Sequence, residues 1–352
     1  MLLILLSILL LALTAGIIAQ ISLNKLRAEK NRNDAKLLQE ANESLLAYAV
    51  TQAVVGTLPC PDTDANADGL ENRAGTNCSS SIGRLPYRTL GIDNLTDSGG
   101  ASLWYAVAPA YTDNGGLVPR NSSLVSNYVL DGRQVPALAI SPGKPLPGQQ
   151  RVPVTIAGFL EGENANASVD TYAQVGDETN NDLLNGLAVG RFWSLMEKKP
   201  LNEISALLTA YKTACTEYPW AANFAAGADD SVNAMQVGSV PLDVALPADW
   251  NTGCALGIEP SAELRNNWRD QIYYHFCLTS EGNCLSVQGD VALQAEAVLI
   301  APGNLLAAQN RATQTLANFF EDENASGDTP YKYLKPINYD GTFNDSLKIV
   351  AP

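Results

Sequence analysis

The absences that exclude most in this sequence concern histidine and the common catalytic motifs. The 352-residue chain has one histidine, His275, and no Cys-x-x-Cys pair. Zinc and iron–sulfur sites are bound by clusters of Cys and His residues, so we expect neither kind of site. No Gly-x-Ser-x-Gly or His-Glu-x-x-His motif occurs, and His275 lies in an aromatic run typical of a strand. We therefore expect a protein that is not an enzyme.

Basic residues are also scarce. Lys and Arg number 22 against 37 Asp and Glu, which gives a net charge of −15. A chain this acidic repels polyphosphates, so nucleic-acid partners are not expected. The same charge is compatible with cation binding.

Charge is missing altogether from Met1 to Leu23, a segment with no proline and only one glycine. An apolar helix of this length spans the roughly 30 Å hydrocarbon core of a bilayer. Helix-compatible sequence continues until Gly56, Pro59 and Pro61. The pattern predicts a transmembrane helix over 1–23 and its soluble continuation over 24–58.

A cleaved signal peptide is the alternative interpretation of the first segment. Signal peptides begin with basic residues and have a shorter apolar core, and here no Lys or Arg precedes the run. The basic residues that follow, from Lys25 to Arg32, would face the cytoplasm by the positive-inside rule. The cysteines point the other way, and we give them more weight.

Six cysteines in a chain with an export-type segment predict a disulfide framework in an oxidising compartment. Many pairings are possible. Proximity in the sequence favours the pairs Cys60–Cys78, Cys215–Cys254 and Cys277–Cys284.

An internal repeat at an offset of 160 residues is the second strong signal. The run 137–143 (Ala-Leu-Ala-Ile-Ser-Pro-Gly) returns as 297–303 (Ala-Val-Leu-Ile-Ala-Pro-Gly). Gln149-Gln-Arg151 returns as Gln309-Asn-Arg311, and 159–165 returns as 319–325. The repeat predicts one αβ structure used twice, and we expect the recurring Arg and Glu-Asn residues to pack alike in both copies.

The expected fold class is α+β: a long N-terminal transmembrane-to-soluble helix carries two related αβ units with antiparallel sheets. The first unit is assigned to 59–170, and the second, with an irregular tail, to 171–352. Residues Leu38, Ala41, Leu45 and Ala49 recur at helical spacing and should pack on the first sheet. A second helical segment is expected from Leu183 to Ala214, broken near Lys199-Pro200.

An acidic loop between Cys60 and Cys78 resembles the opening of a calcium-binding loop. Ca²⁺ prefers oxygen ligands, which alternating Asp and Asn side chains can supply, and the glycine that follows them allows the loop to turn. We predict metal ligation by Asp62, Asp64, Asn66 and Asp68. The closing glutamate of such loops is absent, so Glu71 or more distant residues would complete the shell. The alternative is a solvated acidic loop held by the disulfide.

The order of an uncharged helix, a soluble helix and a disulfide-bearing αβ head resembles the type IV pilin and pseudopilin superfamily. The similarity is strongest over 1–110, where Leu58-Pro-Cys-Pro-Asp62 and Leu85-Pro-Tyr-Arg-Thr-Leu-Gly91 look like a bacterial pilin-like group. No Gly-Phe-Thr-Leu-x-Glu processing signal occurs, and no acidic residue precedes Glu29. With a head this large, the chain looks more like an X-type minor pilin or a K-type tip pseudopilin than a major pilin.

The resemblance implies a minor pilin-like subunit, single-pass in the bacterial inner membrane, with its head in the periplasm or in a filament at the cell surface. It would act in filament assembly, tip capping or surface contact in a type IV pilus or type II secretion system. Its partners would be other pilin or pseudopilin subunits, contacted through the N-terminal helix. A membrane-anchored calcium-dependent adhesin is the first alternative, and an acidic surface hydrolase is the second.

Overall fold

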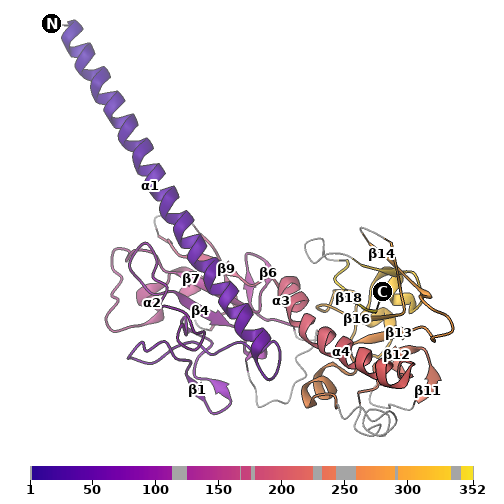
Figure 1. The fold of residues 1–352 in the computed structure, drawn as a ribbon. Coiled ribbons are helices and arrows are strands. Elements are labelled where there is room, and N and C mark those ends of the chain that lie inside the picture. The colour runs from indigo at the N-terminus through magenta and orange to yellow at the C-terminus, as the bar shows by residue number, and fades with distance from the viewer. Residues whose placement is uncertain are drawn as a thin grey trace.

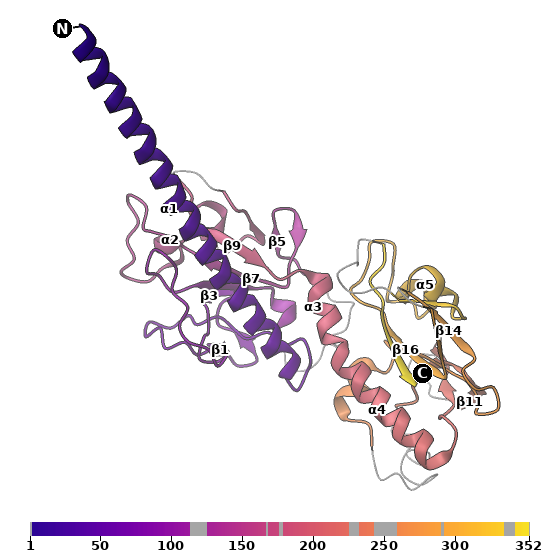
Figure 2. The same cartoon turned by 45° about the horizontal axis from the view of Figure 1, so that its top comes forward.

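The computed structural model describes residues 2–112, 125–166, 168–175, 179–224, 232–242, 259–289, 292–333 and 342–351. The fold is mixed helix and sheet. One long helix, α1 (Leu2–Thr51), leads into a first sheet-bearing unit, and helices α3 (Val189–Met196) and α4 (Lys198–Cys215) lead into a second. Figures 1 and 2 show the first part of α1 extending well beyond both units.

The second half of α1 packs on strands β7 (Ala137–Ser141) and β9 (Leu183–Gly186). The predicted stripe is confirmed, because Leu38, Leu45 and Ala49 are all at most 1 % exposed. Asp34 fixes the start of this contact: its carboxylate accepts hydrogen bonds from the backbone N and the hydroxyl of Ser98, both at 2.7 Å.

The predicted transmembrane helix, and with it the fold class and the single-pass inner-membrane localisation, are corrected by the structure. Within the described residues, no helix is long and apolar enough to cross a membrane. From Gln20 onward, α1 carries charges at short intervals, including Lys25, Glu29 and Lys30. Each such charge costs about 2.5–3.5 kcal/mol at the centre of a membrane helix. What the structure supports is a mixed helix and sheet fold.

The first unit is built around a four-stranded antiparallel sheet in the order β3-β4-β7-β9. Its outer strand β3 (Ile82–Arg84) pairs with β4 (Trp104–Val107), which pairs with β7. All residues of β3, β4 and β7 are buried, so the sheet forms the centre of this unit. Its fourth strand, β9, lies where a helix was expected to begin.

The second unit has a six-stranded antiparallel sheet in the order β11-β10-β12-β13-β16-β18. Its strands are β10 (Ala221–Ala222), β11 (Val232–Met235), β12 (Val237–Ser239), β13 (Tyr273–Phe276), β16 (Ala297–Ala301) and β18 (Ser346–Ala351). Helix α4 packs on β16 and β18 as α1 packs on β7 and β9. The repeat in the sequence therefore corresponds to a repeat in structure.

Smaller elements also recur in the two units. Each unit has a three-stranded sheet with one parallel pair, β6-β5-β8 in the first and β15-β14-β17 in the second. These strands are β5 (Val129–Leu130), β6 (Arg133–Gln134), β8 (Thr171–Tyr172), β14 (Leu285–Gln288), β15 (Leu293–Ala295) and β17 (Tyr331–Lys332). A short hairpin joins β1 (Arg73–Ala74) to β2 (Asn77–Cys78).

The short helices follow the same repeat. Helix α2 (Ile156–Phe159) corresponds to α5 (Leu316–Phe319), and 3-10 helix η2 (Gly162–Ala165) corresponds to η6 (Asp322–Ser326). Further turns of helix among the described residues are η1 (Pro109–Tyr111) and the π-helix η5 (Leu264–Trp268).

One hydrophobic core extends across both units. It contains Leu45 of α1, the sheet residue Leu138, Trp193 of α3 and Leu299 of the second sheet. A smaller cluster around Phe319 and Tyr331 fills the far side of the second sheet. The two units are thus joined by a shared apolar interior, with α3 between them.

Candidate functional site

The acidic loop is held against the outer edge of the first sheet. Cys60 is bonded to Cys78 at its base. Asp62 pairs with Arg84 of β3 through two backbone hydrogen bonds of 3.0 and 2.8 Å. The loop therefore continues the sheet by one residue before it turns into solvent.

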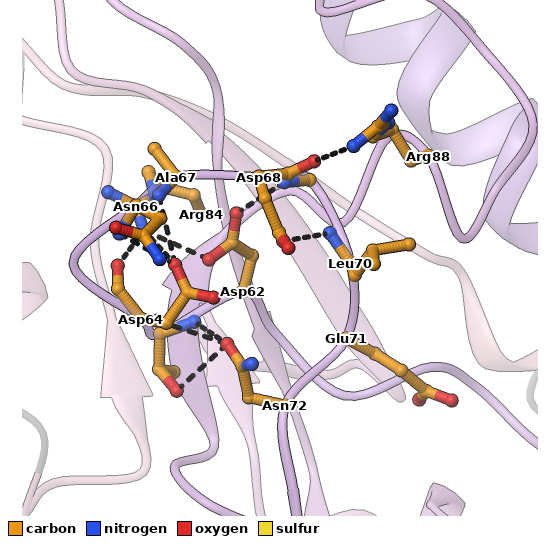
Figure 3. A network of polar contacts seen from close by, with 12 residues as sticks. Asp62, Asp64, Asn66, Ala67, Asp68, Leu70, Glu71, Asn72, Arg84 and Arg88 are labelled. Atoms are coloured by element: carbon orange, nitrogen blue, oxygen red, sulfur yellow. Dashed lines mark hydrogen bonds and ion pairs between the residues drawn. The ribbon is translucent and has the colours of Figure 1, made fainter.

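The predicted ligands do come together. Carboxylate oxygens of Asp62, Asp64 and Asp68 lie within 4.8 Å of one another. Figure 3 shows the three side chains on one side of the loop, with Arg84 among them. Asn66 follows Asp64 around the turn.

Backbone amides already use one oxygen of each carboxylate. Gly69 N donates to Asp62 Oδ2 at 2.8 Å, and Leu70 N donates to Asp68 Oδ1 at 2.9 Å (Figure 3). Asp64 Oδ1 accepts from the backbone N of Asn66 and of Ala67, both at 2.9 Å. The bonds to Asp64 and Asp68 are local Asx-type turns, and the bond to Asp62 closes the loop across seven residues, so the loop is shaped without any metal.

A guanidinium group supplies the positive charge. Arg84 Nη2 lies 2.9 Å from Asp62 Oδ1 and 3.8 Å from Asp64 Oδ1, and it also donates to the backbone O of Asp64. The side chains of Arg84 and Asp62 are 10 % and 2 % exposed, so this is a buried ion pair. Arg84 is not among the site residues predicted from the sequence, although a basic residue on a buried strand beside an acidic loop is a usable signal.

These residues do not fit a calcium site in their present arrangement. A Ca²⁺ ion needs six to eight oxygen ligands, and here it would have to displace Arg84 from Asp62. Glu71 is engaged elsewhere, since its carboxylate accepts from Cys60 N at 2.9 Å and pairs with Arg73 at 3.0 Å. Calcium binding stays a prediction, and the geometry favours the alternative of a loop held by a disulfide and an ion pair.

A cavity of about 620 Å³ opens beside the acidic loop. Its walls come from the loop, from strand β3 and from the segment before α2. They include Asp64, Arg84, Trp104, Val152, Val154 and Ile156. Val152 and Val154 are 85 % and 47 % exposed, whereas Trp104 is 3 % exposed.

A second set of acidic residues forms a buried network in each unit. In the first unit, Asp182 Oδ2 accepts from Glu161 N and from Asn164 Nδ2, both at 3.0 Å. Gln149 Nε2 donates to Glu161 Oε1 at 2.6 Å, and Arg151 donates to the backbone O of Gly143 at 2.8 Å.

The second unit repeats this network. Asp345 Oδ2 accepts from Glu321 N at 3.1 Å and from Asn324 Nδ2 at 2.9 Å, and Gln309 donates to Glu321. Arg311 Nη2 donates to the backbone O of Pro302 at 2.9 Å. In both copies the arginine thus holds the Pro-Gly loop and the aspartate holds the Glu-Asn segment, which is the packing role expected from the repeat.

Burial raises the pKa of several of these acids. The pKa of Asp182 is raised to about 7 by burial, against the hydrogen bonds from Glu161 N and Asn164. Burial, reinforced by the neighbouring Glu321, raises the pKa of Asp345 well above its usual value. Burial also raises the pKa of Glu197 to about 7, although Gly303 N donates to its carboxylate at 2.7 Å.

Two of the three predicted disulfides, Cys60–Cys78 and Cys277–Cys284, are present. Cys215 is also disulfide-bonded, and its predicted partner Cys254 lies outside the described residues. These disulfides indicate an oxidising, non-cytoplasmic compartment.

His275 lies in β13, as expected, and its ring contacts the Tyr331 hydroxyl. Burial lowers the pKa of His275.

Comparison of the chain with protein-family models, with curated proteins and with solved structures finds no match.

Proposed function

We propose that this protein is a structural subunit of an extracytoplasmic filament, of the minor pilin or pseudopilin kind, acting in filament assembly, tip capping or surface contact. One observation carries the proposal: the part of α1 that extends beyond the head. The described side chains from Gln20 to Asn33 are all exposed, and burial begins only at Asp34. A helix exposed on every face gains stability when it packs against other helices.

Two large apolar side chains on this extension favour packing between copies. Ile21 is 63 % exposed and Leu26 is 53 % exposed. Covering such residues removes apolar surface from water at about 25 cal/mol per Å². Helices of neighbouring subunits, aligned along a filament axis, would provide that cover.

The head supports a terminal position in such a filament. It holds two sheet-bearing units in place of one, and the second lies well to the side of α1 (Figures 1 and 2). A head of this width would obstruct a further subunit stacked directly above it. The disulfides also suit a filament outside the cytoplasm.

Site-specific cross-linking within filaments tests the proposal. Ile21→Cys places a thiol on the extension, and Asn202→Cys places one on an exposed position of α4 as a matched control. After treatment of the source cells with a short bis-maleimide, we expect the C-terminally tagged Ile21→Cys chain to cross-link to another subunit in sheared filaments. The control should remain uncross-linked. Absence of the tagged wild-type chain from the sheared fraction of cells that shed filaments would contradict the proposal.

The calcium-dependent adhesin and the acidic hydrolase remain less favoured predictions. Arg84 already pairs with Asp62 of the acidic loop, and the paired carboxylates Glu161–Asp182 and Glu321–Asp345 are bonded to backbone and amide groups. Neither arrangement argues for a surface ligand or a scissile bond.

A further inference from the structure

The two units can be aligned residue by residue along one row of paired residues that crosses each sheet. In the first unit a row of paired residues runs Asp62, Arg84, Trp104, Ile140. In the second, the corresponding row runs Ala222, Ser239, Tyr273, Ile300. The last pair, Ile140 and Ile300, is separated by the 160 residues of the sequence repeat.

A pair of glycines supports this alignment. Gly83 and Gly238 precede Arg84 and Ser239, the second residues of the two rows. A Cβ atom at Gly83 would lie 2.6 Å from the backbone O of Asp62, and one at Gly238 would lie 1.9 Å from the backbone O of Ala222. In both units the backbone of the paired segment therefore passes so close to this position that only glycine fits.

The alignment makes Phe224 the counterpart of Asp64, since Phe224 lies two residues after Ala222 and Asp64 lies two residues after Asp62. Phe224 is buried and packs against Tyr273, Phe319 and Phe320, with ring centroids 5.3–6.0 Å apart. The phenyl ring of Phe224 therefore fills this place in the second unit. In the first unit the shorter Asp64 stands at this place, and the cavity of about 620 Å³ is open.

The cavity wall also differs from its counterpart in ways that suit a ligand. The exposed Val152 and Val154 correspond to Ala312 and Gln314. In the second unit, Gln314 turns back to donate to the backbone O of Asp270 at 2.7 Å. The first unit thus presents apolar side chains to solvent where the second presents small or polar ones.

Two buried donors in this wall lack an acceptor among the described residues: Nε of Arg84 and Nε1 of Trp104. The counterpart of Trp104 is satisfied, because the Tyr273 hydroxyl donates to the backbone O of Gly327 at 2.6 Å. A buried donor without a partner destabilises the folded state. An occupant that brings an acceptor would remove this destabilisation.

We propose that this cavity is a docking site for an aromatic side chain on a segment of a partner protein. The ring would take the place that Phe224 takes in the second unit, against Trp104, Val154 and Ile156. A backbone carbonyl of the same segment would accept from Trp104 or Arg84. A peptide carries both the ring and the carbonyl, which is why we assign a peptide segment as the occupant. The inference does not depend on the filament function.

Methyl NMR of the full chain with N-acetyl-phenylalaninamide as the probe tests the site. We expect shifts confined to Ile82, Val152, Val154 and Ile156 and a Kd on the order of 1 mM. N-acetyl-alaninamide, which lacks the ring, should shift these methyls at least tenfold less. Phenol, which lacks the peptide carbonyl, should bind at least several-fold more weakly than the probe.

Variants taken from the second unit provide the matched test. Val152→Ala/Val154→Gln, which introduces the residues of 312 and 314, should weaken the probe at least fivefold. Both positions are exposed, so this variant should fold. Asp64→Phe should close the cavity and abolish binding, whereas Val175→Ala, an exposed change elsewhere, should leave it unchanged. No shift at about 20 mM probe, equal shifts from the alanine analogue, phenol binding as tight as the probe, or unchanged affinity in the double variant would each overturn the proposal.

Discussion

At the scale of single residues, Glu197 couples stability to pH. It is fully buried, and its raised pKa of about 7 means that the folded state holds its proton where the unfolded chain, with a pKa near 4.5, has lost it. The stabilisation that comes from the proton on Glu197 is therefore complete below the pKa of the unfolded chain, and it is lost as the pH rises to the pKa of about 7 in the folded state.

We therefore expect the Glu197→Gln variant to gain stability over wild type as pH rises from 4.5 to 8, by roughly 2–3 kcal/mol. The amide oxygen can still accept from Gly303 N. Urea unfolding of both proteins at pH 4.5 and pH 8 measures this gain. A wild-type-minus-variant difference that is the same at both pH values would contradict the assignment.

Arg84 provides a second test at this scale. Removing one partner of a buried ion pair leaves the other charge uncompensated, which costs about 3–5 kcal/mol. Arg84→Met should destabilise the protein by that order, and the double variant Asp62→Asn/Arg84→Met should recover part of the loss. A double-mutant cycle on unfolding free energies measures the coupling.

The same loop offers a test of calcium binding. Because Arg84 already neutralises Asp62, we expect 5 mM CaCl₂ to leave the wild-type melting temperature within about 1 °C of that in MgCl₂. A calcium-specific rise of several degrees would restore the calcium-site prediction.

At the scale of elements, the amphipathic half of α1 holds the first unit together. Leu45 is completely buried against the sheet, and Glu40 on the same helix is exposed. Leu45→Ala should lower the unfolding free energy by about 2–5 kcal/mol, and Glu40→Ala should change it by no more than about 0.5 kcal/mol. Equal effects of the two substitutions in denaturant unfolding would contradict the packing described for α1.

Strand β9 shows where element prediction from sequence fails. Residues 183–186 begin a helix-compatible run, yet they form a strand because they complete the free edge of β7 through four residue pairs. Helix follows in two pieces, α3 and α4, that meet at Glu197 rather than at Lys199-Pro200. Pro200 lies in the first turn of α4, where its missing N–H costs nothing.

At the scale of the whole molecule, the shared core predicts cooperative unfolding. Leu45, Trp193 and Leu299 belong to one cluster that crosses from the first unit through α3 to the second. We expect a single calorimetric transition whose enthalpy matches the van't Hoff value. Trp193→Ala should lower hydrogen-exchange protection in β7 and in β16 together. Two separate transitions in the wild-type protein would show that the units are independent.

The sequence by itself determined the features that depend on local pattern. Periodic apolar residues predicted the buried face of α1. The proximity of the cysteines in the sequence predicted two disulfides correctly, and the repeat at an offset of 160 residues predicted the duplicated structure. These signals survive because each depends on residues close together in the chain or on similarity between two of its segments.

Only the tertiary structure decided what depends on distant partners. Arg84 approaches Asp62 across 22 residues, and it changes an apparent metal loop into an ion-paired one. Within the part of the chain that the structure describes, no helix is long and apolar enough to span a membrane, which corrected the expected membrane helix. Asp64 and Phe224 share no sequence similarity, yet sheet register brings them to equivalent places. Such pairings are set by the packing of whole sheets, which no local pattern specifies.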